Sequence, residues 1–299
     1  MNGARKVHLV RLAGVIMFVA GAASSASAQS GDAKRGEYLF AAGGCAGCHT
    51  DEKNGGQLIA GGRELKTPFG SFFGPNITAD PKFGIGSWTD AEFIRALREG
   101  RRPDGAHYFP VFPYTSFTWM TDRDMVDLKA FIFSLPKSER PSRPHEIAFP
   151  FSLRFLQFGW KALFFREGPF QPDPAKSTQV NRGTYLVEAL GHCAECHSPR
   201  NILGGIPGSM RFAGDPKAPG GGKVPNITPD RDTGIGKWSD GDIDELLASG
   251  MTPDGDSVGG EMGEVVRNST SKLTPEDRKA MLAYLRQLVP VSHKVRGGS

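Results

Sequence analysis

The sequence predicts a mostly α-helical protein built from two tandem domains of the same design. A Cys-x-x-Cys-His motif occurs at residues 45–49 and again at residues 193–197. The sequences Pro-Asn-Ile-Thr and Gly-Ile-Gly-x-Trp also occur twice, and each second copy lies 150 residues after the first. Two copies at such a long spacing indicate a duplicated domain rather than a solenoid. The chain length of 299 residues agrees, because domains average about 150 residues.

The repeated cysteine motif indicates the chemistry of each domain. The two copies use all the cysteines of the chain, which are Cys45, Cys48, Cys193 and Cys196. Two thiols at this spacing form thioethers to the vinyl groups of a c-type haem, and His49 and His197 then become the proximal iron ligands. A zinc site, a redox dithiol and a disulfide are the alternatives for Cys-x-x-Cys. They do not require the adjacent histidine in both copies, so the motifs favour two covalently bound haem c groups.

Residues 1–28 have the features of a secretory signal peptide. The segment opens with three basic residues, Arg5, Lys6 and Arg11. An apolar run at residues 14–23 and the small-residue cleavage signal at 26–28 follow. The apolar run is shorter than the about 20 residues of a membrane span, although an uncleaved anchor is the alternative. Cleavage lowers the formal net charge from +4 to +1. The mature protein is then nearly neutral, which argues against a nucleic-acid partner and fits export to the periplasm.

The mature chain divides into a first domain at residues 29–140, a proline-rich linker at 141–178 and a second domain at 179–299. In each domain the sequence Arg-Gly-x-Tyr-Leu precedes the cysteine motif and predicts a short helix that leads into it. Tyr38 and Tyr185 of these helices are interpreted as packing residues.

Capping signals predict two further helices in each domain. Thr89 and Glu92 have the capping-box spacing, and Gly100 is a suitable C-cap. The equivalent residues of the second domain are Ser239, Asp242 and Gly250. The closing helices begin after the N-cap candidates Thr121 and Thr274.

The repeated loops carry an asparagine and a tryptophan in each domain. Asn76 and Asn226 match the Asn-x-Thr glycosylation acceptor, but their equal places in the repeat favour a structural role. Trp88 and Trp238 either pack against the haem edge or donate the indole N–H to a haem propionate, and both interpretations stay open.

The distal iron ligand of the second domain is expected to be Met262. It lies in the segment 259–263 before the closing helix, where a thioether commonly supplies the sixth ligand of a c-type haem and raises its potential. A buried core methionine is the structural alternative, and Met251 is the second candidate ligand.

The first domain has no methionine in the body of the corresponding loop. Met120, directly before the closing helix, is the candidate ligand, although alignment of the helix caps places it opposite Leu273, which has the character of a core residue. His107, a different ligand or an open coordination position are the alternatives.

The linker contains a densely aromatic segment at residues 149–165. This segment is too short and too basic to span a membrane. It is interpreted either as an interfacial helix or docking surface for a partner subunit, or as packing between the two domains.

In combination, these features resemble the cytochrome c subunits of bacterial membrane-associated alcohol, gluconate and sorbitol dehydrogenases. The motifs that carry the resemblance cover nearly all of the mature chain and are Arg35-Gly36-x-Tyr38, both Cys-x-x-Cys-His motifs, Pro75-Asn76-Ile77-Thr78, and residues 113–122, 149–160 and 181–201. The resemblance implies two cytochrome c-like domains, each wrapped around a covalent haem. The family usually has three haem domains, where two are expected here. It often reads Met-Pro-Tyr where this chain has Phe112-Pro113-Tyr114.

We therefore expect a periplasmic dihaem c-type cytochrome that carries electrons from a dehydrogenase to a downstream cytochrome or oxidase. Residues 149–165 are the candidate contact with the inner-membrane surface, and no catalytic residue is assigned. A subunit that works only within a complex is one alternative. The other is a dihaem enzyme of the peroxidase or thiosulfate-oxidising type, with the first haem as its active site.

Overall fold

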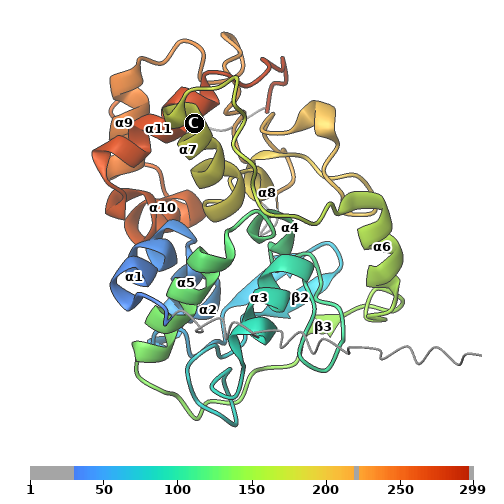
Figure 1. The fold of residues 1–299 in the computed structure, drawn as a ribbon. Coiled ribbons are helices and arrows are strands. Elements are labelled where there is room, and N and C mark those ends of the chain that lie inside the picture. The colour runs from blue at the N-terminus through green and yellow to red at the C-terminus, as the bar shows by residue number, and fades with distance from the viewer. Residues whose placement is uncertain (1–29, 219–221, 296–299) are drawn as a thin grey trace, which may run out of the picture.

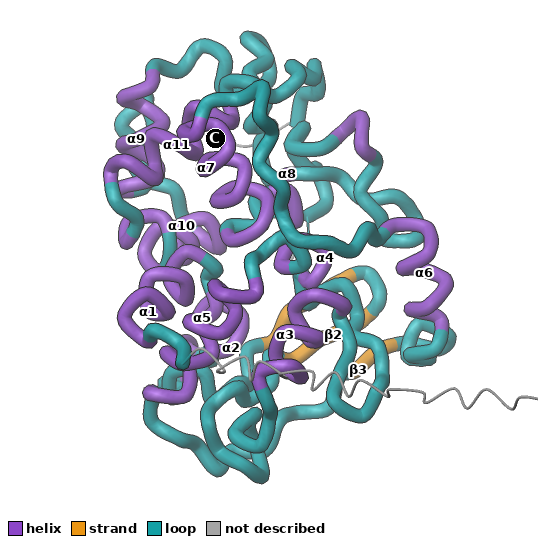
Figure 2. The backbone as a smooth tube through the Cα atoms, viewed as in Figure 1, coloured by secondary structure: helices purple, strands orange, loops and turns teal. Residues whose placement is uncertain are grey.

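The computed structural model describes residues 30–218 and 222–295. The predicted signal peptide lies outside the described residues. In Figure 1 the first half of the chain forms the lower part of the molecule and the second half forms the upper part. Figure 2 shows that helices and loops make up nearly all of the fold, with a small sheet in the lower half.

The elements follow one another in two similar series. The first series is α1 (Ala33–Ala42), α2 (Cys45–His49), η1 (Glu52–Asn54), β1 (Glu64–Thr67), β2 (Gly70–Phe73), α3 (Asp90–Glu99), α4 (Tyr114–Phe117) and α5 (Asp122–Ser134). The linker contributes β3 (Glu146–Ile147) and α6 (Leu156–Phe164). The second series is α7 (Thr178–Thr184), η2 (Tyr185–Leu190), α8 (Ala194–His197), η3 (Gly208–Met210), α9 (Asp240–Ser249), α10 (Gly260–Asn268), η4 (Thr270–Lys272) and α11 (Pro275–Leu285).

In each half the helix before the cysteine motif packs against the closing helix, α1 against α5 and α7 against α11. A glycine allows the close approach. A Cβ atom added to Gly36 would lie 1.9 Å from the carbonyl oxygen of Asp127, and one added to Gly183 would lie 1.9 Å from that of Ala280. Such contacts are impossible for any residue with a side chain, so glycine determines this packing.

The predicted capping signals are all present. Thr89 forms a capping box with Glu92 at the start of α3, and Ser239 does so with Asp242 at the start of α9. Both helices end at a glycine in the left-handed conformation. The side chains of Thr121 and Thr274 cap α5 and α11 as expected.

The second half contains one additional residue between the arginine of its first helix and its cysteine motif. Arg35 and Cys45 are ten positions apart, whereas Arg182 and Cys193 are eleven apart. The chain takes up this residue in η2, a π-helical turn at Tyr185–Leu190. A π-helical turn holds one more residue than an α-helical turn, so the cysteine motif keeps its position.

The linker is built into the first half rather than being a free connection. Its strand β3 pairs antiparallel with β2, with Gly70 opposite Ile147. The side-chain amine of Lys161 in α6 donates hydrogen bonds to the carbonyls of Glu99 and Gly100, at the end of α3. Trp160 of the same helix donates its indole N–H to the carbonyl of Leu203 in the second half, at 2.8 Å. The segment therefore does pack between the two halves, as one of the two interpretations expected.

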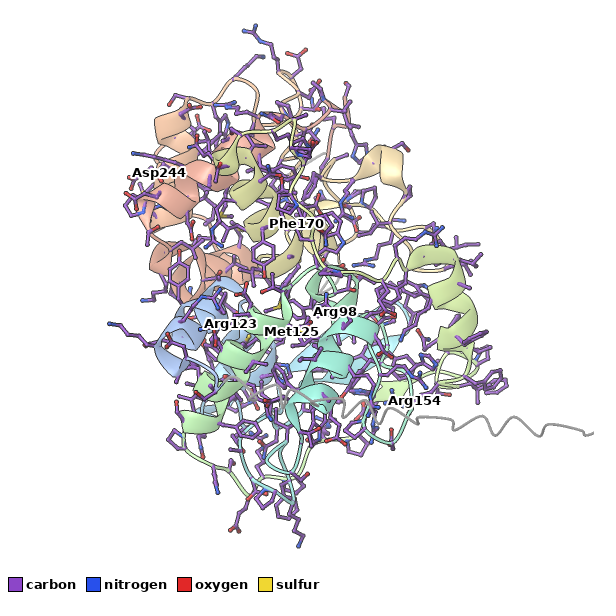
Figure 3. All side chains as sticks on the ribbon, viewed as in Figure 1. Arg98, Arg123, Met125, Arg154, Phe170 and Asp244 are labelled. Carbon is purple, nitrogen blue, oxygen red and sulfur yellow. The ribbon has the colours of Figure 1, made fainter. Side chains whose placement is uncertain are left out.

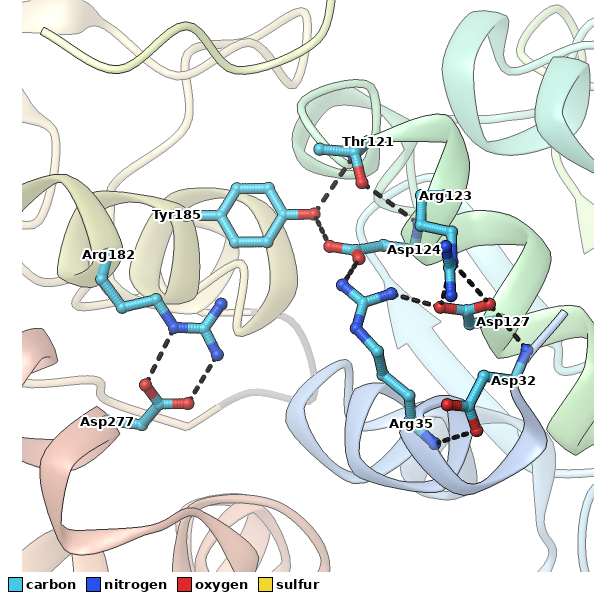
Figure 4. A network of polar contacts seen from close by, with 9 residues as sticks. All are labelled: Asp32, Arg35, Thr121, Arg123, Asp124, Asp127, Arg182, Tyr185 and Asp277. Carbon is cyan, nitrogen blue, oxygen red and sulfur yellow. Dashed lines mark hydrogen bonds and ion pairs between the residues drawn. The ribbon is translucent and has the colours of Figure 1, made fainter. Parts of the chain in front are cut away.

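Tyr38 and Tyr185, which were predicted to be packing residues, also form reciprocal hydrogen bonds between the two halves. The hydroxyl of Tyr38 donates to Asp277 at 2.6 Å, and that of Tyr185 donates to Asp124. Each tyrosine comes from one half and each aspartate from the first turn of the other half's closing helix. Figure 4 shows the Tyr185 side of this arrangement and the pairing of Asp277 with Arg182.

Candidate functional site

The first cysteine motif borders a cavity of about 770 Å³, called the first cavity below. It is lined by Cys45, Cys48 and His49 of α2. Apolar side chains from α1, β2, α3, α4 and α5 supply most of the remaining wall. Its size and apolar lining are typical of a pocket that encloses a cofactor.

The motif histidines have the tautomer that a proximal iron ligand needs. The Nδ1 atom of His49 lies 2.8 Å from the carbonyl oxygen of Pro75, and Nδ1 of His197 lies 2.8 Å from that of Pro225. Because a carbonyl can only accept, Nδ1 carries the proton in both rings. The Nε2 lone pair of each ring is therefore free for a metal, and the hydrogen bond fixes the ring's orientation.

Cys45, Cys48 and Cys193 are partly buried, whereas Cys196 is exposed. Burial raises the pKa of Cys45 and of Cys193 to about 12. A redox-active Cys-x-x-Cys requires the opposite, a lowered thiol pKa, so the redox-dithiol alternative finds no support here. The described cysteines form no disulfide, and no cluster of three or more His, Cys, Asp or Glu side chains suited to a metal ion occurs in these parts of the chain. Paired thiols, an oriented histidine and an apolar cavity together fit a covalently attached haem.

Three arginines line part of the first cavity, namely Arg102, Arg143 and Arg154, together with His145, whose pKa is lowered by burial and by the charges of Arg154 and Arg102. The guanidinium of Arg154 stands 4.5 Å from the ring centre of Phe109, and burial and the charge of Arg102 lower its pKa. Arg102 and Arg143 each pair with a carboxylate, but Arg154 forms no ion pair within the described residues. Figure 3 shows Arg154 beside α6. The three guanidinium groups suit the two carboxylates of a haem. No local spacing in the sequence points to them, because Arg143 and Arg154 come from the linker, far along the chain from Arg102.

The candidate distal ligands occupy different surroundings. Met120 is fully buried and is the one methionine among the lining residues of the first cavity. Phe112 lines the same cavity, whereas His107 does not and instead contacts the amine of Lys161 at 2.9 Å. Met262 is half-buried on α10, a helix where an irregular loop was expected. Met251 is 36% exposed.

The repeated asparagines are structural and the first tryptophan faces the cavity. Asn76 is 2% exposed and Asn226 is 3% exposed, and each side-chain oxygen accepts a hydrogen bond from the backbone N–H two residues later. Their burial supports the structural role over glycosylation. Trp88 lines the first cavity, as either interpretation of this residue requires.

The two cysteine motifs lie close together across the contact between the halves. Glu195 of the second motif accepts a hydrogen bond at 2.8 Å from the hydroxyl of Thr115, which lies on α4 in the first half. Helix α10 of the second half contacts α2, the helix of the first motif. Leu190 and His192 of the second half also line the first cavity. Groups attached at the two motifs are therefore neighbours.

Comparison with known proteins gives matches over both halves. The family model for cytochrome c matches residues 33–136 and 180–289. A diheme cytochrome c-type protein of Cereibacter sphaeroides is 48% identical over 267 residues, which are 87% of this chain and 86% of that protein. The fructose dehydrogenase cytochrome subunit of Gluconobacter japonicus is 39% identical over 265 residues, 88% of this chain and 54% of the subunit.

A cytochrome c subunit of alcohol dehydrogenase (quinone) from Gluconacetobacter polyoxogenes is 38% identical over 282 residues, 90% of this chain and 59% of the subunit. The chain thus spans less than two thirds of both dehydrogenase subunits, but most of the diheme protein.

Proposed function

The chain belongs to the cytochrome c family, and from this premise we propose that it carries electrons in the periplasm from a dehydrogenase to a downstream cytochrome or oxidase. It has two tandem cytochrome c domains and two covalently bound haem c groups, as the sequence predicted. The observation that carries the proposal is the closeness of the two motifs, because an electron that enters at one haem then has the second within its reach.

We assign the attachment of each haem to its motif. In the first domain Cys45 and Cys48 form the thioethers and His49 is the proximal ligand, with Met120 as the distal ligand. In the second domain the corresponding residues are Cys193, Cys196, His197 and Met262. When bound, each haem supplies a one-electron redox centre. The protein holds the proximal ring by its hydrogen bond to a proline carbonyl, surrounds the site with apolar side chains and excludes water, and these features set the potential.

The cations of the first cavity have a defined part in this proposal. Arg154, which has no ion-pair partner among the described residues, would pair with a haem carboxylate together with Arg102. Oxidation adds positive charge to the iron, and the positive charges of Arg102 and Arg154 near the haem carboxylates oppose this. The two arginines therefore favour a higher reduction potential of the first haem.

A dehydrogenase partner is supported by the relatives, several of which are cytochrome subunits of dehydrogenases. The linker offers a surface for it. Phe149, Phe155, Phe158 and Leu163 are 80%, 69%, 73% and 65% exposed, and we call this set the linker patch. An exposed apolar area of this kind marks an interaction site. None of the helices in the described ranges has the length and apolarity to cross a membrane, and a membrane surface is the other candidate for the linker patch.

The enzyme alternative is not favoured by the three relatives reported above, which are a diheme cytochrome and two cytochrome subunits. Electron delivery to a downstream cytochrome or oxidase is instead the role that a two-haem chain supports.

Stopped-flow reduction tests the proposal. The oxidised holoprotein is mixed with the substrate-reduced catalytic subunit of a fructose or a quinone-dependent alcohol dehydrogenase. We expect saturable reduction of both haems, followed by rapid reoxidation by a soluble cytochrome c. The double variant Phe155→Ser, Phe158→Ser should raise the half-saturating concentration several-fold without changing either potential, because apolar contacts are lost on binding.

Val289→Ser is the matched control, since Val289 is 78% exposed elsewhere on the surface. Absence of reduction by both enzymes, together with peroxide turnover, would overturn the proposal in favour of the enzyme alternative. Binding to anionic lipid vesicles that the double variant loses, with unchanged reduction kinetics, would assign the linker patch to the membrane instead.

A further inference from the structure

His192, directly before the second cysteine motif, has a left-handed backbone with φ of 39°. A residue with a side chain meets steric strain in this region that glycine avoids. The residue in the same place before the first motif is Gly44, with φ of 60°. Within the described ranges, the other non-glycine residues with positive φ are Ile59 and Phe212, which occupy equivalent places in the two domains. Their conformation belongs to the shared fold, whereas that of His192 does not.

The side chain of His192 reaches into the other domain. It lines the cavity of the first domain, and its ring lies 5.5 Å from that of Phe117, edge-on. Gly43 and Gly44, which directly precede Cys45, line the same cavity. The residue that precedes the second attachment motif therefore shares a cavity wall with the segment that precedes the first.

A second contact holds this part of the chain in place. Glu195, in the second motif, accepts a hydrogen bond from the hydroxyl of Thr115 at 2.8 Å and forms an ion pair with Arg200. Thr115 lies on α4, the helix that also carries Phe117. The second attachment loop is thus docked on the wall of the first cavity from both sides of Cys193.

We infer that His192 is a positioning residue that closes the first haem site and bridges it to the second. The inference rests on the proposed attachment of the haems at the two motifs. Its imidazole fills the side of the first cavity that faces the second domain, and its backbone is bonded directly to Cys193. The left-handed backbone of His192 is strained, and strain of this kind is retained where the residue has a functional role.

Two consequences follow for the haems. Exclusion of water at this edge disfavours the more positively charged oxidised iron, so His192 raises the potential of the first haem. The packing of His192 on Phe117, beside the hydrogen bond between Thr115 and Glu195, fixes the separation of the two motifs, so His192 also favours electron exchange between the haems.

The test compares the holoprotein with its variants His192→Gly and His192→Gln. Glycine is the residue that the first domain uses at this place, so the backbone strain is released and the variant is expected to fold. We expect full haem content and unchanged thermal stability, a lower midpoint potential for one haem only, and several-fold slower electron equilibration between the haems after flash reduction. His192→Gln, which keeps a donor and part of the volume, should restore part of both properties.

His293→Gln is the matched control, because His293 contacts the carbonyl of Ala213 at 2.9 Å within the second domain alone. It should leave both potentials and the equilibration rate unchanged. Wild-type potentials and rate in His192→Gly, or equal shifts in both haems accompanied by lower stability, would overturn the inference. The haem content of the wild type tests the attachment proposal separately, since a failure there appears as fewer than two haems per chain.

Discussion

At the scale of single residues, the two proposed distal methionines do not occupy equivalent places. Residues 76 and 226, 88 and 238, and 100 and 250 are all equivalent pairs 150 positions apart, and by the same offset Met262 corresponds to Phe112. Alignment of the helix caps Thr121 and Thr274, which are 153 positions apart, instead places Met120 opposite Leu273, which is 5% exposed. In the proposed assignment the second haem therefore has its thioether at the expected place, whereas the first would rely on a residue that the second domain uses for packing.

Substitution by leucine tests the two ligands while roughly preserving side-chain volume. Met262→Leu should abolish the near-infrared methionine-to-iron band of one haem and lower its potential, because a thioether ligand raises the potential. Met120→Leu should do the same for the other haem. Met251→Leu is the control and should leave both bands intact. If Met120→Leu leaves the spectrum of the oxidised protein unchanged, the first iron has a different ligand or an open position.

At the scale of elements, the crossing of the first and closing helices determines where each cysteine motif begins. The Cβ of an alanine at position 36 would lie 1.9 Å from a backbone oxygen of α5, so the helices must separate. Because α1 leads directly into α2, such a movement also displaces the attachment residues.

Gly36→Ala should therefore lower the free energy of unfolding by about 3 kcal/mol, at the upper end of the cost of overpacking. Denaturant unfolding followed by circular dichroism measures the loss. Gly159→Ala is the control within a helix, because no atom lies within 4 Å of its added Cβ. It should be neutral or stabilise by up to about 1 kcal/mol through helix propensity. Equal stability of the two variants would show that the helices adapt to the added methyl group.

The helix caps could be predicted from the sequence, whereas contacts between distant parts of the chain could not. The capping box at Thr89 and the caps at Thr121 and Thr274 were correct because each signal lies within three residues of its partner. Strand β3, the position of Arg154 and that of His192 depend on contacts between distant parts of the chain, for which a single sequence holds no local signal. The motif residues could be predicted, whereas the wall around them could not. The exact division at residues 140 and 178 stays a prediction.

At the scale of the whole molecule, the two domains dock through the reciprocal tyrosines. Asp277 is shared, since it accepts hydrogen bonds from Arg182 of its own domain at 2.8 and 2.6 Å and from Tyr38 of the other at 2.6 Å. Burial acts to raise the pKa of Asp277, but these hydrogen bonds lower it by more, so its pKa lies below the ordinary value of 3.8. Docking is thus coupled to the ionisation of a carboxylate that lies between the domains.

The double variant Tyr38→Phe, Tyr185→Phe should weaken the contact between the domains. A hydrogen bond to a charged group contributes about 1.5–3 kcal/mol, and we expect the lower end for Tyr38, which is half-buried. Separate domain transitions in calorimetry, and a larger radius in small-angle X-ray scattering, measure the loss.

Acidification of the wild type should likewise give separate domain transitions and a larger radius. The contribution of ionised Asp277 is complete above its unfolded-state pKa near 3.8 and is lost as the pH falls through the lower native value. The single variant Tyr38→Phe should show a smaller change over the same pH range, because it has already lost one of the bonds that lower the pKa. A double variant with a single wild-type transition and an unchanged radius would mean that the domains dock through other contacts, such as the ion pair of Arg63 with Glu264.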